Sequence, residues 1–433
     1  MRFSKCVLRA VLATCVLAVA LACGADHVGN AQPSSTPQGS GGVNRVEHRQ
    51  KPSLVIVSFD GVRADYLDRF DLPNFRRVMT RGARARSMRP VFPTITFPNH
   101  YSLVTGLYPE HHGIVENSFF DPVRNATYAF RNFQSVSDGT WYGGEPIWVT
   151  AERQGMVSAC FFWPGSEADI KGIRPTHWNR YDGSVPNERR IETVLGWLRL
   201  PADRRPHVIT LYFSDVDSAS HRTAIGGSDV AAAVTAVDTA LGLLLDGLDR
   251  LENRDRVLLM LTSDHGMTDT AAVRIVQLGD LIDTTGVRAG FTGPVTGLHV
   301  SSEAGTPTTV RDRINAKLQH GRAYLRQEVP ERHHFRDTPR AGDVVVIMEE
   351  GWLLATSIVN RGLIQREWGE HGWDPDLPSM KAIFLVAGPG IPGGITIPEV
   401  ENVDVYPLMT ELLGLQPAPG LDGQPGKIRS MLK

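Results

Sequence analysis

The chain has 433 residues, of which 42% are hydrophobic and 21% charged, and its formal net charge is -2. This composition is typical of a globular protein and excludes a fibrous or wholly disordered chain. The small negative charge excludes bulk attraction to polyanions, so we expect no binding to a nucleic-acid duplex. The length exceeds that of most single hydrophobic cores, which predicts either two domains or one large domain with insertions.

Residues 1–22 are predicted to be a signal peptide. A basic start precedes the apolar run 11–22, which is too short to span a bilayer comfortably. The sequence Ala-Leu-Ala-Cys at 20–23 fits a small-residue cleavage site and also resembles a bacterial lipobox. We therefore expect export, either to the periplasm or as a lipoprotein that contacts the membrane only through a lipid on Cys23.

Residues 23–51 are predicted to be a flexible tether, because they are rich in Gly, Ser, Pro, Gln and Asn. If Cys23 is lipidated, Cys160 is the single cysteine left after removal of the signal peptide. No internal disulfide is then expected. Cys160 lies in an apolar run and is interpreted as a buried small hydrophobic residue.

Residues 52–433 are predicted to form one α/β domain. Continuous apolar runs are typical of strands that are covered on both faces, and helical patterns lie between them, most clearly over 228–251. This alternation predicts a doubly wound, mainly parallel sheet with helices on both faces. The irregular stretch from about 273 to 341 is expected to be a small inserted cap. The expected strands are 54–59, 157–163, 208–213, 257–261, 344–348 and 383–387.

Acidic and histidine side chains follow several of these runs. Asp60 follows the first, Asp217 and His221 follow the third, and Asp264 and His265 follow the fourth. Ligands of open α/β sheets bind beyond the carboxyl ends of the strands. Carboxylates and imidazoles together suit zinc, and Asp217 and His221 are one helical turn apart.

His371 joins this candidate set because it lies in Gly-Glu-His-Gly, where the glycines permit close backbone approach. Any one of these residues alone is more simply interpreted as a helix cap, a turn former or a polar surface group. Their joint occurrence at successive strand ends favours a metal centre. His100 is interpreted as a packing or supporting residue.

A candidate nucleophile lies in the segment 92–101, Phe-Pro-Thr-Ile-Thr-Phe-Pro-Asn-His-Tyr. Pro98 is well placed for a first helical turn, so a threonine before it is either a helix cap or a hydroxyl beside a metal. Threonine has no low pKa of its own, and metal coordination must supply the alkoxide. These residues alone do not choose between Thr94 and Thr96.

Eight ordered segments resemble the nucleotide pyrophosphatase/phosphodiesterase family of the alkaline phosphatase superfamily. They cover roughly residues 53–430 in the family's order, and a signature of this length is highly specific, although any single block would be weak. With the lipobox, the resemblance indicates a bacterial member. The segments are Ser58–Gly61, Thr96–Tyr101, Val104–Pro109, His112–Asn117, Trp163–Ser166, Asp217–His221, Thr262–Met267 and Gly369–Gly372.

The resemblance implies an alkaline phosphatase-like fold and two Zn²⁺ per chain. It implies that Thr96 attacks phosphorus to give a covalent phosphothreonine, which water hydrolyses, and that Asn117 donates to a phosphoryl oxygen. Three aspartates against two zinc ions leave local positive charge for an anionic substrate. The implied ligands are Asp60, Thr96, Asp264 and His265 for one ion, and Asp217, His221 and His371 for the other.

The implied substrate is a nucleotide or another phosphodiester or pyrophosphate. Phe97 and Tyr181 resemble the two sides of the family's nucleobase slot, where aromatic faces stack on a base. The alternative is that both are core aromatics. Phe119 and Phe120 stand where relatives often carry Met, and this departure is expected to reshape the pocket.

Other functions remain as alternatives. A sulfatase needs Cys or Ser at the position of Thr96, so it is disfavoured. A phosphomonoesterase needs an added cation, and the nearest candidate, residues 171–174, has the wrong spacing. A lipid-headgroup phosphodiesterase would use the same site. A non-catalytic binding lipoprotein is disfavoured because every expected ligand is present. Nothing in the sequence specifies an oligomeric state.

Overall fold

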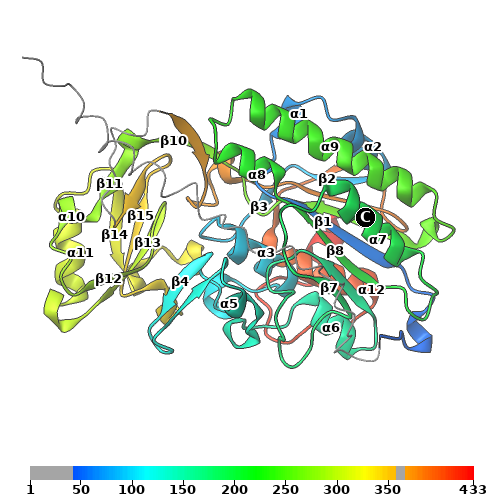
Figure 1. The fold of residues 1–433 in the computed structure, drawn as a ribbon, viewed down its shortest axis with the longest axis horizontal. Coiled ribbons are helices and arrows are strands. Elements are labelled where there is room, and N and C mark those ends of the chain that lie inside the picture. Colours follow the sequence, from blue (N-terminus) through cyan, green and yellow to red (C-terminus); the bar gives the residue numbers. More distant parts are fainter. Residues whose placement is uncertain (1–41, 357–365) are drawn as a thin grey trace, which may run out of the picture. The chain divides into compact units, whose positions relative to one another are not determined.

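The computed structural model describes residues 42–356 and 366–433, and an eight-stranded sheet lies at its centre (Figure 1). Seven strands run in one direction and β18 is antiparallel to both neighbours. The predicted fold class, a doubly wound and mainly parallel α/β sheet, is confirmed. The strand order is β19 (Ile395–Ile397), β2 (Gly82–Ala85), β18 (Phe384–Ala387), β9 (Val257–Thr262), β1 (Ser53–Phe59), β8 (Val208–Phe213), β6 (Ser158–Phe161) and β7 (His177–Asn179).

Helices cover both faces of this sheet, which explains the continuous apolar runs. Along β1, Leu54 and Ile56 enter one core while Val55 and Val57 enter the other, because successive side chains point to opposite faces. The first face carries α3 (Thr96–Thr105), α6 (Ile147–Arg153), α12 (Val405–Leu413) and α13 (Lys427–Met431). The second carries α1 (Tyr66–Arg69), α2 (Pro73–Arg81), α7 (Asn187–Leu198), α8 (Asp215–Ser220) and α9 (Ser228–Asp249).

The expected helix over 228–251 is α9, and its apolar stripe packs against the sheet. Val234, Leu241 and Leu245 are each at most 3% exposed. Among the described helices, only α9 is long and apolar enough to cross a membrane, and 56% of its most apolar window is buried. This burial identifies α9 as a core helix.

A second sheet lies beside the main one and corrects two expectations. Val344–Met348 is β15 of this antiparallel sheet, not a strand of the main sheet. The expected cap at 273–341 therefore extends to at least residue 355, because β15 supplies the core of the small sheet with Val344 and Val346. Its strands are β12 (Val287–Phe291), β13 (Val295–Val300), β15 and β14 (Gly321–Leu325), covered by α10 (Leu278–Leu281) and α11 (Pro307–Asn315).

Four two-stranded pairs lie outside these two sheets among the described residues. They are the pairs β10 (Thr268–Ala271) with β17 (Glu367–Glu370), β11 (Ile275–Gln277) with β16 (Leu353–Ala355), β20 (Val400–Glu401) with β3 (Met88–Arg89), and β4 (Ser118–Asp121) with β5 (Ala126–Ala129). In the sequence, α4 (Pro109–His112) precedes β4 and α5 (Phe133–Ser137) follows β5.

The packed region begins earlier than the predicted end of the tether at residue 51. Asn44 is 1% exposed, its amide donates to the carbonyls of Ala202 and Arg205, and its oxygen accepts from the backbone of Val157. One side chain thus fastens this segment through three hydrogen bonds, which composition does not reveal. The predicted signal peptide and Cys23 lie outside the described residues. Cys160 is buried, as predicted.

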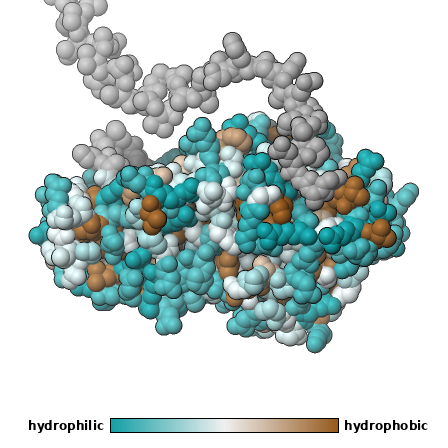
Figure 2. All heavy atoms as spheres, turned by 90° about the horizontal axis from the view of Figure 1, so that it is seen from below, coloured by the Kyte–Doolittle hydropathy of each residue, from teal (hydrophilic) through white to brown (hydrophobic). Residues whose placement is uncertain are grey.

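The face drawn in Figure 2 is mainly hydrophilic, with apolar residues in separate spots. The large hydrophobic side chains that are exposed include Val123, Val273 and Tyr181, which lie far apart in the sequence. Scattered apolar residues are normal on a protein surface. Tyr181, with the exposed Phe130 and Phe133, lines the cavity that contains the candidate site.

Candidate active site

The predicted ligands converge at the carboxyl edge of the main sheet. Asp60 follows β1, Asp217 lies in α8 after β8, Asp264 and His265 follow β9, and His371 follows β17. The backbone of Asp217 donates to the carbonyl of Asp60 at 3.2 Å. Gly61 permits this approach, because its φ is +71° and an added Cβ would stand 3.0 Å from Cα of Asp217.

The ligand atoms of these residues face one another. Nε2 of His265 lies 3.0 Å from Oδ2 of Asp264 and 3.6 Å from Oδ1 of Asp60. Oδ1 of Asp217 lies 3.2 Å from Nε2 of His221 and 3.6 Å from Nε2 of His371. All six carboxylate and imidazole residues predicted as ligands are thus brought together. His265 faces members of both predicted sets.

The arrangement fits metal ions. Oδ1 of Asp60, Oδ1 of Asp217 and Oδ2 of Asp264 are buried, and none makes a well-formed hydrogen bond with the described residues. Their near neighbours are imidazole nitrogens, which can donate to them only when protonated. A buried carboxylate oxygen without a partner is costly unless a cation binds it. Within the described chain, Asp217, His265 and His371 offer ligand atoms within 4.8 Å of one another, and Asp60, His100 and Asp264 form a second such group. Oxygen and imidazole donors of this kind suit zinc.

The protonation states of the three imidazoles differ. Burial lowers the pKa of His221 and of His265, but the charge of Asp217 outweighs it and raises that of His221 to about 9, and the charge of Asp264 raises that of His265, so a cation must displace a proton from each. Burial, followed by the charge of His265, lowers the pKa of His371 to about 3, so its imidazole is neutral and able to bind a cation. Burial together with the charges of Asp264 and Asp217 raises the pKa of Asp60 well above its usual value. Crowded carboxylates of this kind need positive charge among them if all are to ionise.

Two further residues contact the candidate ligands. Nδ1 of His100 lies 3.3 Å from Oδ2 of Asp264 and its Nε2 is 2.8 Å from the hydroxyl of Ser58. This agrees with the interpretation of His100 as a supporting residue. Glu370, which we did not predict, lies 3.9 Å from Nδ1 of His221 and forms a ligand-type group with His221 and His371. Its position beside His371 in the sequence was the available signal.

Thr96 and Thr94 have different surroundings. Thr96 begins α3, lines the cavity, and its hydroxyl lies 3.3 Å from Nε2 of His265. Thr94 is fully buried, donates to the carbonyl of Trp373, and accepts from the backbone of Gly372. Thr96 is therefore the threonine hydroxyl that faces the ligand cluster.

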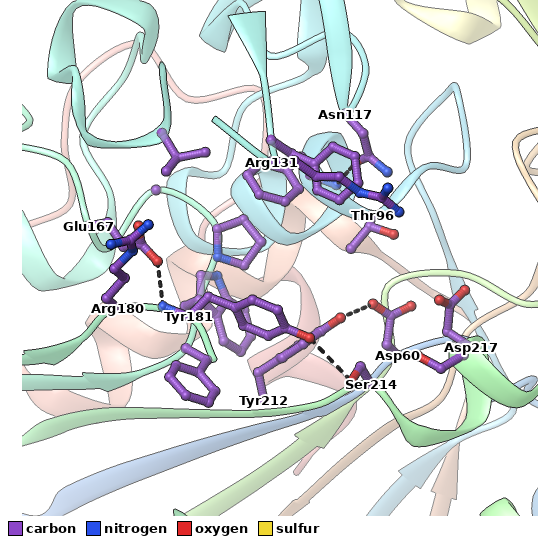
Figure 3. Close-up of a pocket in the computed structure, with 18 of the residues that line it drawn as sticks. Asp60, Thr96, Asn117, Arg131, Glu167, Arg180, Tyr181, Tyr212, Ser214 and Asp217 are labelled. Atoms are coloured by element: carbon purple, nitrogen blue, oxygen red, sulfur yellow. Dashed lines mark hydrogen bonds between the residues drawn. The ribbon is translucent and has the colours of Figure 1, made fainter. Parts of the chain in front are cut away.

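Asn117 lies beside Thr96 in the cavity (Figure 3). Its Oδ1 accepts a hydrogen bond from the backbone N–H of Phe97 at 2.9 Å. This bond fixes the side-chain amide so that its nitrogen is the end left to donate. An anion beside Thr96 would find that donor in place.

A cavity of about 630 Å³ extends from the ligand cluster, and both predicted aromatic residues line it. Tyr181 is 49% exposed, whereas Phe97 is partly buried against Tyr128 and Phe130, with ring centroids at 6.2 and 5.8 Å. The lining residues that sequence reasoning missed include Phe130, Arg131, Phe133, Glu167, Arg180, Tyr212 and Arg222. Their only sequence signal was proximity to the recognised motifs.

The cavity carries positive side chains. Arg131, Arg180 and Arg222 line it and form no ion pair with another described residue. The guanidinium of Arg180 lies 4.2 Å from the ring centroid of Phe133, and that of Arg131 lies 5.2 Å from Phe130. Aromatic faces hold such cations in place. Glu167 also lines the cavity and interacts electrostatically with Arg180, so Arg131 and Arg222 are the cations left to attract an anion.

Phe119 and Phe120, the expected departure from the family, lie behind the cavity wall. Neither residue lines the cavity. Phe119 is fully buried and stacks on Tyr128 at 5.1 Å, while Phe120 lies beneath the guanidinium of Arg288 at 3.5 Å. Alternation along β4 turns both side chains into packing contacts.

The fold and the ligand cluster together define an alkaline phosphatase-like α/β protein with a candidate metal centre at the carboxyl edge of its sheet. Residues 54–374 match the profile of the family described as type I phosphodiesterase / nucleotide pyrophosphatase. The chain belongs to this family.

Curated relatives agree with this assignment. The chain is 39% identical to human ectonucleotide pyrophosphatase/phosphodiesterase family member 1 over 89% of its own length and 42% of that protein. It is 36% identical to a venom phosphodiesterase from Macrovipera lebetinus over 89% of its own length and 46% of that protein. The chain therefore spans less than half of each of these relatives.

Solved structures match over their full length. Human ectonucleotide pyrophosphatase / phosphodiesterase 5 superposes with a TM-score of 0.82 at 30% identity, over 88% of this chain and 100% of that one. An inactive threonine-to-alanine variant of the murine protein in complex with AMP gives a TM-score of 0.81 at 30% identity, over 89% and 100%. These relatives are animal proteins, and the expected bacterial origin stays a prediction.

Proposed function

We propose that this protein is a two-zinc hydrolase that cleaves phosphate diesters or pyrophosphates of nucleotides through a phosphothreonine. The observation that carries the proposal is the convergence of three buried carboxylates and three imidazoles, with their ligand atoms facing one another, beside the hydroxyl of Thr96. The family membership and the AMP complex of the inactive murine threonine-to-alanine variant support the same chemistry.

The proposed ligands are the two sets named from the resemblance, one around Asp60, Asp264 and His265 with Thr96, the other around Asp217, His221 and His371. When bound, zinc supplies positive charge that favours the ionised threonine oxygen and neutralises phosphoryl oxygens. His100 and Glu370 hold the imidazoles and carboxylates in orientation from outside these sets.

The reaction begins when Oγ1 of Thr96 gives its proton to solvent and attacks phosphorus. The bond between phosphorus and the leaving oxygen breaks, and the leaving group departs with the electron pair. The nitrogen of Asn117 donates to a phosphoryl oxygen as negative charge develops there. Water then attacks the phosphothreonine, releases the phosphoryl product and restores the hydroxyl.

The cavity supports a nucleotide as the substrate. Phe97 and Tyr181 offer aromatic faces for a base, which stack without reading its identity. Arg131, on the wall that carries Thr96 and Asn117 in Figure 3, offers charge for a phosphate. That arginine also favours the second candidate, a phosphomonoesterase, because such an enzyme needs an added cation. Lys171 and Arg174, the cations considered from sequence, do not line the cavity.

Turnover of two substrates by the zinc-loaded protein separates these candidates. We expect faster hydrolysis of the nitrophenyl ester of thymidine monophosphate than of nitrophenyl phosphate. The reverse preference would support the monoesterase. Thr96→Ala should abolish turnover with zinc content near two per chain, whereas Thr96→Ser keeps a hydroxyl and should retain part of it. Full activity of Thr96→Ala would reject the nucleophile.

A further inference from the structure

Asp60 presents its two carboxylate oxygens to different surroundings. The hydroxyl of Tyr212 donates to Oδ2 at 2.5 Å, the contact drawn as a dashed line in Figure 3. The other oxygen, Oδ1, is buried, has no donor among the described residues, and faces Nε2 of His265 at 3.6 Å. One oxygen is therefore anchored, and the other is left to bind a cation.

The main sheet fixes the relative position of the two residues. In the parallel pair β1 and β8, Ser58 is opposite Tyr212 and Phe59 is opposite Phe213. The backbone N–H of Asp60 continues this pairing and donates to the carbonyl of Phe213 at 2.9 Å. The donor and acceptor thus belong to adjacent strands, which are rigid supports for a functional side chain.

The ring of Tyr212 is held by its neighbours. Its centroid lies 5.3 Å from the ring of His100 and 6.1 Å from the ring of Tyr181. Arg190 donates to its carbonyl at 2.9 Å. The hydroxyl is therefore directed at Asp60 by packing and not by that hydrogen bond alone.

We propose that Tyr212 is a positioning residue for the metal centre, and that its hydroxyl fixes the rotation of the Asp60 carboxylate so that Oδ1 faces the ion. This inference rests on the proposed zinc site. A neutral donor suits the task, because Lys or Arg at this place would repel the cations. Partners outside the ligand set change metal affinity about 10- to 100-fold when removed.

Tyr212→Phe removes only the hydroxyl oxygen and tests the proposal. Zinc affinity of the purified full chain, measured by competition with a chelator, should fall about 10- to 100-fold at one of the two sites. Excess zinc should restore most of the lost turnover, which a purely structural defect would not allow. Tyr406→Phe is the matched control. The hydroxyl of Tyr406 in α12 bonds Thr150 of α6 at 2.8 Å and accepts from the backbone of Ala418, away from the proposed ligands.

A double variant supplies the sharper test. Asp60→Ala and Asp60→Ala/Tyr212→Phe should bind zinc equally, since the hydroxyl acts only through the carboxylate. Additive losses would overturn the proposal. Wild-type zinc affinity in Tyr212→Phe would also overturn it. A third contrary outcome is a melting temperature of zinc-free Tyr212→Phe far below that of zinc-free Tyr406→Phe, because the hydroxyl would then support the fold and not the metal site. If the wild-type chain binds no zinc, the proposed function itself fails.

Discussion

Asn117 has two roles that mutation can separate, because its oxygen is hydrogen-bonded while its nitrogen is left to donate. Oδ1 accepts from the backbone N–H of Phe97 at 2.9 Å, at the first turn of α3. Asn117→Ala removes both the acceptor and the donor. Asn117→Asp keeps an oxygen for Phe97 but replaces the donor with negative charge.

The expected loss of kcat is larger in free energy than the expected loss of folding stability. Removing one hydrogen-bond donor from a developing oxyanion costs about 10²- to 10³-fold in kcat, or about 2.7–4 kcal/mol. Asn117→Asp should lose at least as much, because a carboxylate repels the phosphoryl group. The lost bond to Phe97 in Asn117→Ala costs about 1 kcal/mol of folding stability, which is too little to unfold most domains.

The assay is hydrolysis of the nitrophenyl ester of thymidine monophosphate, followed with the melting temperature of each variant. We expect both variants to fold and to lose kcat. If Asn117→Asp keeps wild-type kcat while Asn117→Ala loses it, the residue acts only by holding Phe97 and the donor role is wrong.

Three further outcomes follow from the site and the core. His371→Ala should lose zinc as well as activity, and elemental analysis showing two zinc ions per chain would contradict its role as a ligand. Leu245→Ala in α9 should lower the free energy of unfolding by about 2–5 kcal/mol, while Leu243→Ala, 44% exposed on the same helix, should change it by less than about 0.5 kcal/mol. Burial raises the pKa of Glu116 to about 7 from 4.5. Between these values the folded chain holds a proton that the unfolded chain has lost, so unfolding free energy falls as pH rises. In Glu116→Gln the unfolding free energy, measured by denaturant titration at several pH values, should fall less as pH rises. If it falls as much as in the wild type, the raised pKa of Glu116 is not its cause.

Much of the fold was predictable because its signals are local. The continuous apolar run before Asp60 indicates a strand buried on both faces, and the three-four spacing of Val234, Val237 and Leu241 indicates a helix with one buried stripe. Both patterns arise from backbone geometry over a few residues. Ordered motifs likewise indicated the family without any knowledge of contacts.

Other features depend on partners distant in sequence. Val344–Met348 has the composition of a buried strand, but only its pairing with Val295–Val300 assigns it to the small sheet. Asn44 lies in a polar segment, yet it is buried because residues near 157 and 202–205 offer it hydrogen bonds. Composition cannot report such pairings, since they join elements more than 40 residues apart.

The sequence alone determined which chemical groups the protein has: the aspartates and histidines after successive strands, a threonine at a helix start, and Asn117. The residues by themselves did not separate Thr96 from Thr94, and the family resemblance selected Thr96. The tertiary structure supplied the physical reason, because the hydroxyl of Thr94 is hydrogen-bonded to Trp373 and Gly372 while that of Thr96 faces the candidate ligands. Only the tertiary structure decided that Tyr212 reaches Asp60. The sequence specifies the type of each residue. The hydrogen-bond partner of each buried polar atom depends on how segments distant in sequence pack together.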